Sequence, residues 1–160
     1  MMADWTTFLP FLAAVFVVAL SGAIFMPGPW YKTLEKPSWT PPDWLFAPAW
    51  LVLYVAIAVA GWRVWQADGI GLALGVWGLN LVFNAAWSWL MFGRRQIGLA
   101  LADALAMLAT IIAFMALAWP ISQQATWLFA PYLAWVAFAS LLNWAILRRN
   151  PGASDVTRTA

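Results

Sequence analysis

The chain has 160 residues, of which 65% are hydrophobic and 9% are charged, and its mean hydropathy is +0.80. Soluble domains contain about 45–50% apolar and about 25% charged residues, so this composition indicates a membrane protein. The sequence contains no cysteine and no histidine, which excludes disulfides, cysteine nucleophiles, histidine-based catalytic triads and ordinary zinc sites. Its 8 basic and 6 acidic residues are too few for a phosphate-binding face, so we expect no nucleic-acid partner.

Charged residues divide the sequence into apolar stretches of the length that spans a membrane. A helix needs about 20 apolar residues to cross roughly 30 Å of hydrocarbon. The first three uncharged runs contain 27, 19 and 25 residues, enough for one helix each, and the run between Asp103 and Arg148 contains 44. Pro120 and the polar residues after it break this last run into two. We therefore predict an all-α bundle of five transmembrane helices, at residues 6–26, 44–66, 71–92, 97–119 and 125–147.

The basic residues are distributed unevenly over this topology. Seven of the eight fall on one side of a five-helix arrangement, and only Arg63 falls on the other. The positive-inside rule then predicts that the first loop and the C-terminus face the cytoplasm and that the N-terminus lies outside. The first apolar segment lacks the basic leader and the cleavage site of a signal peptide, so we expect it to be the first helix.

The first connection, residues 26–43, differs from the other connections in length and composition. It contains five of the ten prolines and three aromatic residues. Proline fixes φ and favours extended backbone before it, so this loop is expected to be stiff. The loop is either a lid packed over the cytoplasmic end of the bundle or part of the aromatic belt at the membrane surface.

We predict a single domain at residues 1–150 and a disordered polar tail at 151–160.

Few polar side chains lie inside the predicted spans, and each needs a partner or a cavity. Asn80, Asn84 and Ser88 recur every four residues and share one face of the third helix. They either contact a ligand or join helices by hydrogen bonds, and the second role is favoured for Asn80. Asp103 lies near the start of the fourth helix, where an ion pair with one of the two preceding arginines is favoured over a proton relay.

Aromatic residues at helical spacing suggest a place for a flat ligand. Trp135 and Phe138 fall on one side of the fifth helix, beside the small residue Ala139. A ring system could lie between this face and Trp50 or Trp87, because stacked aromatic pairs contribute about 0.5–1.5 kcal/mol beyond burial of their area. Packing between helices is the alternative explanation.

A pair of glycines near the start of the third helix has the small-xxx-small spacing. Gly71 and Gly75 are four residues apart, so they permit another helix to approach closely. This pattern predicts a homodimer that forms through the third helix.

The sequence also contains a series of longer motifs in a characteristic order. They are WY at 30–31, LEKPSWTPPDW at 34–44, APAW at 47–50, LY at 53–54, LVFNAAWS at 81–88, FG at 92–93, ALAD at 100–103, PYLAWVAFA at 131–139 and LN at 142–143. Together they closely resemble the translocator protein (TspO/MBR) family, whose members are also called tryptophan-rich sensory proteins or peripheral-type benzodiazepine receptors. The resemblance extends over nearly the whole chain and implies a bacterial-type member with five membrane helices, often dimeric, in the cell envelope.

The resemblance also implies a function. Members are membrane receptors or translocators that bind tetrapyrroles such as protoporphyrin IX and haem-like molecules, and drug-like ligands such as isoquinoline carboxamides and benzodiazepines. The implied roles are tetrapyrrole transport or regulation and stress sensing, with porphyrin as a ligand, no obligatory cofactor, and lipid or sterol as further partners. The alternatives are a light-dependent porphyrin-degrading enzyme, for which the chain offers no catalytic residue, and a ligand-regulated scaffold for partner proteins. The positions that match the family's pocket are Tyr31, Pro42, Ala49, Trp50, Asn84, Trp87, Ser88, Trp135, Phe138 and Ala139.

The chain departs from the family's sterol-recognition motif at the end of the fifth helix. Trp144 stands where the motif requires tyrosine, so we do not expect high-affinity cholesterol binding. Nine of the 14 tryptophans are assigned to one of two groups. We assign Trp50, Trp87 and Trp135 to a ligand, and we assign to the interfacial belt the tryptophans at positions 5, 30, 44, 65, 119 and 127.

Overall fold

A computed structural model describes residues 5–153 of the chain. Within this range the secondary structure is helical, with no strand. The elements in chain order are a 3₁₀ turn η1 (Trp5–Phe8), α1 (Leu9–Ile24), α2 (Pro29–Thr33), α3 (Asp43–Asp68), α4 (Leu72–Ser88), a π-helical turn η2 (Trp89–Gly93), α5 (Ile97–Ala118) and α6 (Gln123–Arg149). The predicted all-α class is confirmed for the described residues, and most of the predicted tail, residues 154–160, lies outside them.

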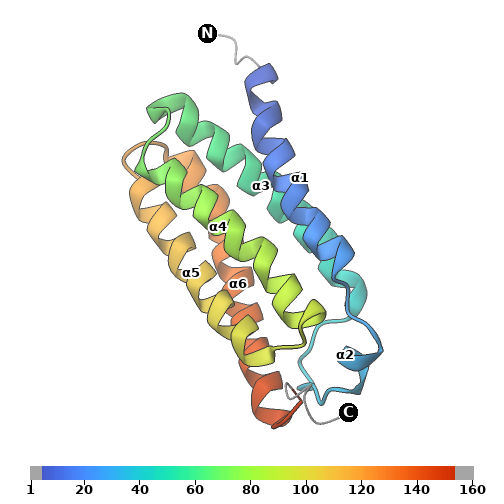
Figure 1. Ribbon diagram of the computed structural model, residues 1–160. Coiled ribbons are helices and arrows are strands. Elements are labelled where there is room, and N and C mark those ends of the chain that lie inside the picture. The colour runs from blue at the N-terminus through green and yellow to red at the C-terminus, as the bar shows by residue number, and fades with distance from the viewer. Residues whose placement is uncertain (1–4, 154–160) are drawn as a thin grey trace.

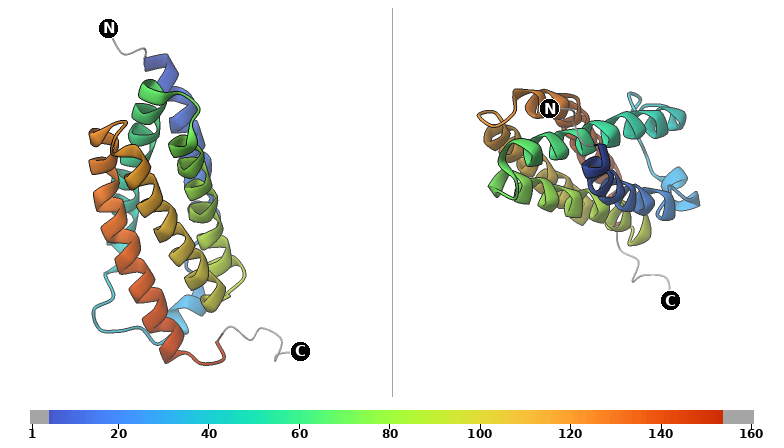
Figure 2. Two further views of the ribbon diagram at one scale, coloured as in Figure 1. Left: turned by 90° about the vertical axis from the view of Figure 1, so that its left-hand side faces the viewer. Right: turned by 90° about the horizontal axis from the view of Figure 1, so that it is seen from above.

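The long helices α1, α3, α4, α5 and α6 run side by side as one bundle (Figure 1 and Figure 2). Helix α5 packs against α4 and α6, α3 packs against α6, and α1 packs against α3 and α4. We call the end that holds the start of α1 and the α3–α4 and α5–α6 turns the upper end (Figure 1). The lower end holds α2, the α4–α5 turn and the end of α6 (Figure 1).

The outer surface of the bundle is apolar, as expected for a protein in lipid. On α1, for example, Phe16, Val17 and Ile24 are 62%, 66% and 70% exposed. Four segments have the length and hydropathy of a membrane span, namely residues 6–24, α3, α5 and α6. Helix α4 has 17 residues and continues through η2 to Gly93. The chain is therefore an all-helical integral membrane bundle.

The long uncharged run between Asp103 and Arg148 contains two helices, as predicted. Helix α5 ends at Ala118, and α6 begins after Ser122. The backbone N–H of Ala125 donates a hydrogen bond of 3.3 Å to Oγ of Ser122, so this serine caps the N-terminus of α6.

Three details of the chain path differ from the predictions. The first loop contains the short helix α2, which starts at Pro29, a residue whose fixed φ suits the first turn of a helix. The regular part of the third predicted helix ends at Ser88, and the π-helical turn η2 follows. Gly71 precedes α4 in extended conformation (φ −124°, ψ −175°), so the two glycines of the predicted pair do not both lie on the helix.

The predicted belt tryptophans are not uniformly exposed. Trp44 and Trp127 are 70% and 66% exposed, which suits a position at the membrane surface. Trp30 and Trp65 instead pack against buried apolar clusters of the bundle. The indoles of Trp30 and Trp65 therefore pack partly inside the protein. The belt prediction was based on their positions near helix ends, and such positions do not show which way a side chain points.

Candidate ligand-binding site

A chain of hydrogen bonds crosses the interior of the bundle and joins four helices. Tyr54 on α3 donates from its hydroxyl to Oδ1 of Asn84 on α4 at 3.2 Å, and Nδ2 of Asn84 donates to the hydroxyl of Tyr132 on α6 at 2.8 Å. The Tyr132 hydroxyl in turn donates to Oδ1 of Asn80 at 3.1 Å, and Nδ2 of Asn80 donates to Oγ1 of Thr110 on α5 at 2.9 Å. The predicted helix-joining role of Asn80 is confirmed, and Asn84 joins helices as well.

Aromatic rings from α3 and α6 lie directly beside this polar network. The ring of Trp50 contacts those of Tyr54 and Tyr132, with centroids 5.2 and 6.3 Å apart. It also meets the ring of Trp135 edge to face at 6.5 Å, and Trp135 contacts Phe138 at 6.3 Å. We call these five residues the aromatic cluster. It combines flat apolar surfaces with two hydroxyls of the polar network, that of Tyr54 at one end and that of Tyr132 in the middle.

Trp87 belongs to a second group of rings near the lower end of α4. Its indole Nε1 donates to Oδ1 of Asn143 at 3.2 Å, and Nδ2 of Asn143 donates to the carbonyl of Ile97 at 3.0 Å. The Trp87 ring meets Phe92 edge to face at 5.6 Å, and Phe92 meets Tyr31 of the first loop at 5.3 Å. Trp87 is thereby bonded to α6 directly and connected to Tyr31 of the first loop through Phe92.

The first loop is packed against the lower end of the bundle. Leu34 is buried in an apolar cluster with residues of η2, α5 and α6, and Pro37 is also buried. The ring of Trp39 meets Phe138 of the aromatic cluster edge to face at 5.8 Å. These contacts match the lid interpretation, because the loop packs on the end of the bundle and contacts one ring of the cluster, Phe138, through Trp39.

Two sets of polar contacts hold this loop in place. The backbone N–H of Glu35 donates to Oδ1 of Asn150 at 2.9 Å, and Nδ2 of Asn150 donates back to the Glu35 carbonyl at 2.9 Å. Within the loop, Nζ of Lys36 donates to the Tyr31 carbonyl at 2.7 Å and lies 4.6 Å from the centroid of the Tyr31 ring. Burial raises the pKa of the Tyr31 hydroxyl, and the charge of Asp43 adds to this effect.

Comparison with known proteins shows the family of this chain. The sequence model of the TspO/MBR family matches residues 8–149. The chain is 41% identical to the tryptophan-rich sensory protein of Cereibacter sphaeroides over 150 residues, which are 92% of this chain and 93% of that protein. It is 35% identical to the translocator protein of Homo sapiens over 156 residues, 92% of each chain. The chain belongs to the TspO/MBR family.

The fold brings some of the predicted ligand-binding residues together and separates others. Trp50, Trp135 and Phe138 lie in the aromatic cluster, and Asn84 reaches it through its hydrogen bonds to the two tyrosines. Ser88 lies beside α1 instead. Its Oγ is 3.8 Å from the position that a Cβ would occupy on Gly22 of α1.

The remaining pocket positions lie around the cluster or apart from it. Pro42 is exposed at the N-cap of α3, and Ala49 and Ala139 are half-buried on α3 and α6. Tyr31 and Trp87 belong to the second group of rings, which Phe92 connects.

The predicted set omitted Tyr54 and Tyr132, which the structure places at the centre of the site. Tyr54 follows Trp50 by four residues and Tyr132 precedes Trp135 by three, so helical spacing puts each tyrosine beside a predicted tryptophan. This spacing is a signal that could have identified both residues. Their hydrogen bonds to asparagines of α4 depend on the packing of three helices and are not visible in the sequence.

Asp103 does not form the predicted ion pair. Within residues 5–153 the structure shows no ion pair for this side chain, and its Oδ2 is buried without a hydrogen-bond partner. Arg94 and Arg95 are both exposed, and the Arg94 guanidinium lies over the ring of Trp89, with Cζ 5.7 Å from the centroid. The indole of η2 therefore takes the place of the carboxylate as the partner of Arg94.

Proposed function

We propose that this TspO/MBR protein is a membrane receptor or translocator that binds a tetrapyrrole, such as protoporphyrin IX or a haem-like molecule, at the aromatic cluster. Drug-like aromatic ligands such as isoquinoline carboxamides and benzodiazepines share its flat, largely apolar chemistry and use the same site. The names of the relatives, tryptophan-rich sensory protein and translocator protein, support a role of this type.

The observation that carries the proposal is the pair Trp50 and Trp135, which meet edge to face beside two tyrosine hydroxyls. Trp135 also contacts Phe138, which Trp39 of the first loop meets edge to face. Stacking on an indole contributes about 0.5–1.5 kcal/mol per good contact, and the hydroxyls offer partners for a few polar atoms of a ligand. Because the two rings contact each other, a flat ligand that stacks between them has to separate them. The loop that covers Phe138 through Trp39 has to move for that entry.

The proposal predicts that the double variant Trp50→Ala, Trp135→Ala binds protoporphyrin IX about tenfold more weakly or worse, because two stacking surfaces are lost. Saturable quenching of tryptophan fluorescence by added protoporphyrin IX measures the affinity. The matched control is Trp119→Ala, Trp127→Ala, which removes another edge-to-face pair of indoles, 6.3 Å apart, near the α5–α6 turn. Equal affinity of the two double variants would place the ligand elsewhere.

We also propose that α4, extended by η2, crosses the membrane in addition to the four apolar spans, and that the upper end faces away from the cytoplasm of a bacterial cell. Among the described residues Arg63 is the basic residue near the upper end, whereas the others lie at the lower end, namely Lys32, Lys36, Arg94, Arg95, Arg148 and Arg149. Because the chain has no cysteine, Ser122→Cys is expected to react with an impermeant maleimide from outside the cell, and Ser38→Cys only after lysis.

A homodimer formed through α4 is part of the same proposal. Gly75 is exposed, and a Cβ at this position would meet no atom within 4 Å, so α4 has open space for a second helix. Leu79 and Val82, one and two turns further along, are 48% and 62% exposed. Because Gly71 precedes the helix, the contact is expected to centre on Gly75 and the residues that follow it.

A further inference from the structure

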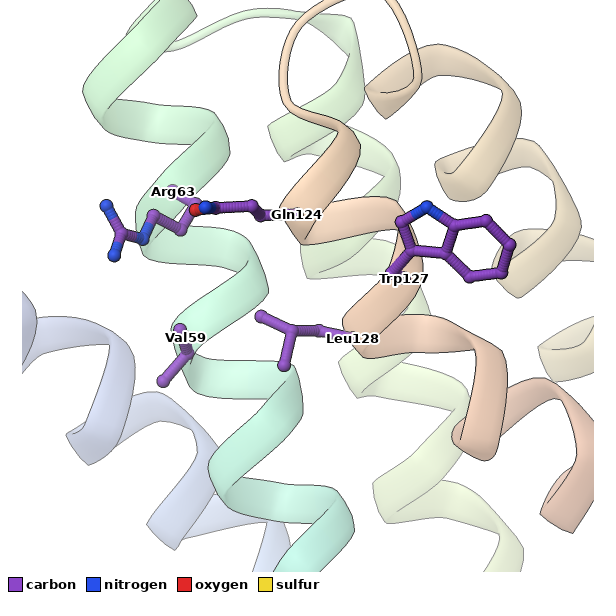
Figure 3. A pocket seen from close by; sticks show the side chains of 5 residues that line it. All are labelled: Val59, Arg63, Gln124, Trp127 and Leu128. Atoms are coloured by element: carbon purple, nitrogen blue, oxygen red, sulfur yellow. The ribbon is translucent and has the colours of Figure 1, made fainter.

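A surface groove lies between α3 and α6, apart from the aromatic cluster and toward the upper end of the bundle (Figure 3). Its volume is about 440 Å³, and its lining residues are Val59, Arg63, Gln124, Trp127 and Leu128. Figure 3 shows Val59 on α3 and Leu128 on α6 at a similar level, with Leu128 directed toward α3. Arg63 and Gln124 lie about one helical turn above them, nearer the last residues of α3 and the first residues of α6. The groove therefore has an apolar part and a polar part, arranged along the axis of the bundle.

The polar part of the groove carries a positive charge. Arg63 is exposed, and its guanidinium lies beside the ring of Trp62, with Cζ 5.5 Å from the centroid. Within the described chain Arg63 forms no ion pair, and no acidic residue lines the groove. The charge of this guanidinium is therefore available to an anion that enters from the membrane side.

The depth of the groove matches the headgroup region of a bilayer. Arg63 precedes the last residue of α3, Asp68, by five positions, which at 1.5 Å per residue is about 8 Å. Gln124 is the second residue of α6, and Trp127, which is 66% exposed, follows within one turn. Tryptophan and arginine side chains at such positions lie at the boundary between headgroups and hydrocarbon.

We infer that this groove binds one anionic phospholipid. The phosphate accepts hydrogen bonds from the Arg63 guanidinium and the Gln124 amide, and the first part of an acyl chain packs on Val59 and Leu128. Arginine suits this role because its planar donors match the oxygens of a phosphate. An anionic lipid is favoured over a zwitterionic one because the groove offers no carboxylate to a choline or ethanolamine group. The remainder of the lipid stays in the bilayer.

Native mass spectrometry of the detergent-solubilised protein tests this inference. The protein is incubated with dioleoyl phosphatidylglycerol or dioleoyl phosphatidylcholine, and the bound lipid is counted for the wild type, Arg63→Gln and Arg94→Gln. Arg94 is the matched control because it is exposed and lies over an indole as Arg63 does, but it is not among the residues that line the groove. We expect the wild type and Arg94→Gln to retain phosphatidylglycerol, and Arg63→Gln to retain about fivefold less.

A second variant, Val59→Trp, fills the apolar part and leaves Arg63 in place. We expect it to lose bound phosphatidylglycerol as Arg63→Gln does, whereas a site for free phosphate would persist. Circular dichroism confirms that each variant is folded before lipids are counted. Equal retention of the two lipids by the wild type, or equal losses from Arg63→Gln and Arg94→Gln, would overturn the inference. So would retention that occurs only on a dimer and is insensitive to Arg63→Gln, since the groove would then be an interface between two copies.

Discussion

Tyr132 connects the polar and the aromatic parts of the site. Its hydroxyl accepts from Asn84 and donates to Asn80, and its ring contacts that of Trp50. The side chain is completely buried, as is that of Asn80. A buried amide without a partner is costly in lipid, so the three side chains fix one another's orientation. The position of Trp50 therefore depends on a residue of α6 that is far away in the sequence.

We predict that Tyr132→Phe lowers the free energy of unfolding by about 1–2 kcal/mol, because two buried amide groups lose a partner at once. Tyr54→Phe is the control, since it removes one donor at the half-buried end of the network and is expected to cost about 0.5 kcal/mol. Unfolding in increasing dodecyl sulfate, followed by circular dichroism, measures both values. A Tyr132→Phe variant no less stable than Tyr54→Phe would contradict this account of the network.

The boundaries of the long helices could be predicted because charge and proline mark them directly. Pro120 and the capping Ser122 separate α5 from α6, and the charged residues Asp43 and Asp68 are the first and last residues of α3. Helix α2 was missed because its five residues carry too little periodicity to stand out in a proline-rich loop. The π-helical turn η2 was missed because its shift in hydrogen bonding leaves no mark in the apolar pattern.

Part of the candidate site could also be predicted from the sequence. Trp50 and Trp135 stand out as aromatic residues in apolar helices, and the family resemblance pointed to both. Their neighbours Tyr54 and Tyr132 could be identified by helical spacing, but the hydrogen bonds of their hydroxyls could not, because these bonds run between helices. Ser88 shares a helix face with Asn84 by spacing, but α1 covers it, and no pattern within α4 could show this.

The first loop and the end of α6 act as one structural element. Asn150 holds the loop through the two reciprocal hydrogen bonds with the backbone of Glu35. We predict that Asn150→Ala increases amide hydrogen exchange at Glu35 about fivefold or more, because its N–H loses its acceptor. Asn150→Asp is the control, since its carboxylate still accepts from Glu35. Unchanged exchange in Asn150→Ala would show that the loop is held by its apolar contacts alone.

The exposed face of α4 leads to a prediction about the oligomeric state of the protein. Gly75→Leu is expected to shift the protein from dimer to monomer in native membranes, because a large side chain would fill the space left for a second helix. Gly98→Leu on α5 is the control, since a Cβ there also meets no atom within 4 Å but lies outside the proposed contact. Chemical crosslinking of membranes measures the shift. A dimer that persists in Gly75→Leu would assign the interface to another face.

The two ends of the molecule differ in charge and in the sites they carry. The lower end combines six basic residues of the described chain with the packed loop and the aromatic cluster nearby. The region toward the upper end carries Arg63 and the groove beside it. We therefore propose two sites for two kinds of molecule, one for a flat aromatic ligand at the cluster and one for a phospholipid at the groove. Their separation along the bundle means that variants of one site are expected to leave the other unchanged.

The most direct test of this account is an experimental structure of the protein in complex with protoporphyrin IX. We expect the macrocycle to lie between Trp50 and Trp135, with the edge-to-face contact of these rings opened and the Tyr132 hydroxyl still bonded to the asparagines of α4. A complex in which the macrocycle lies elsewhere, for example in the groove beside Arg63, while Trp50 and Trp135 remain in contact, would contradict it.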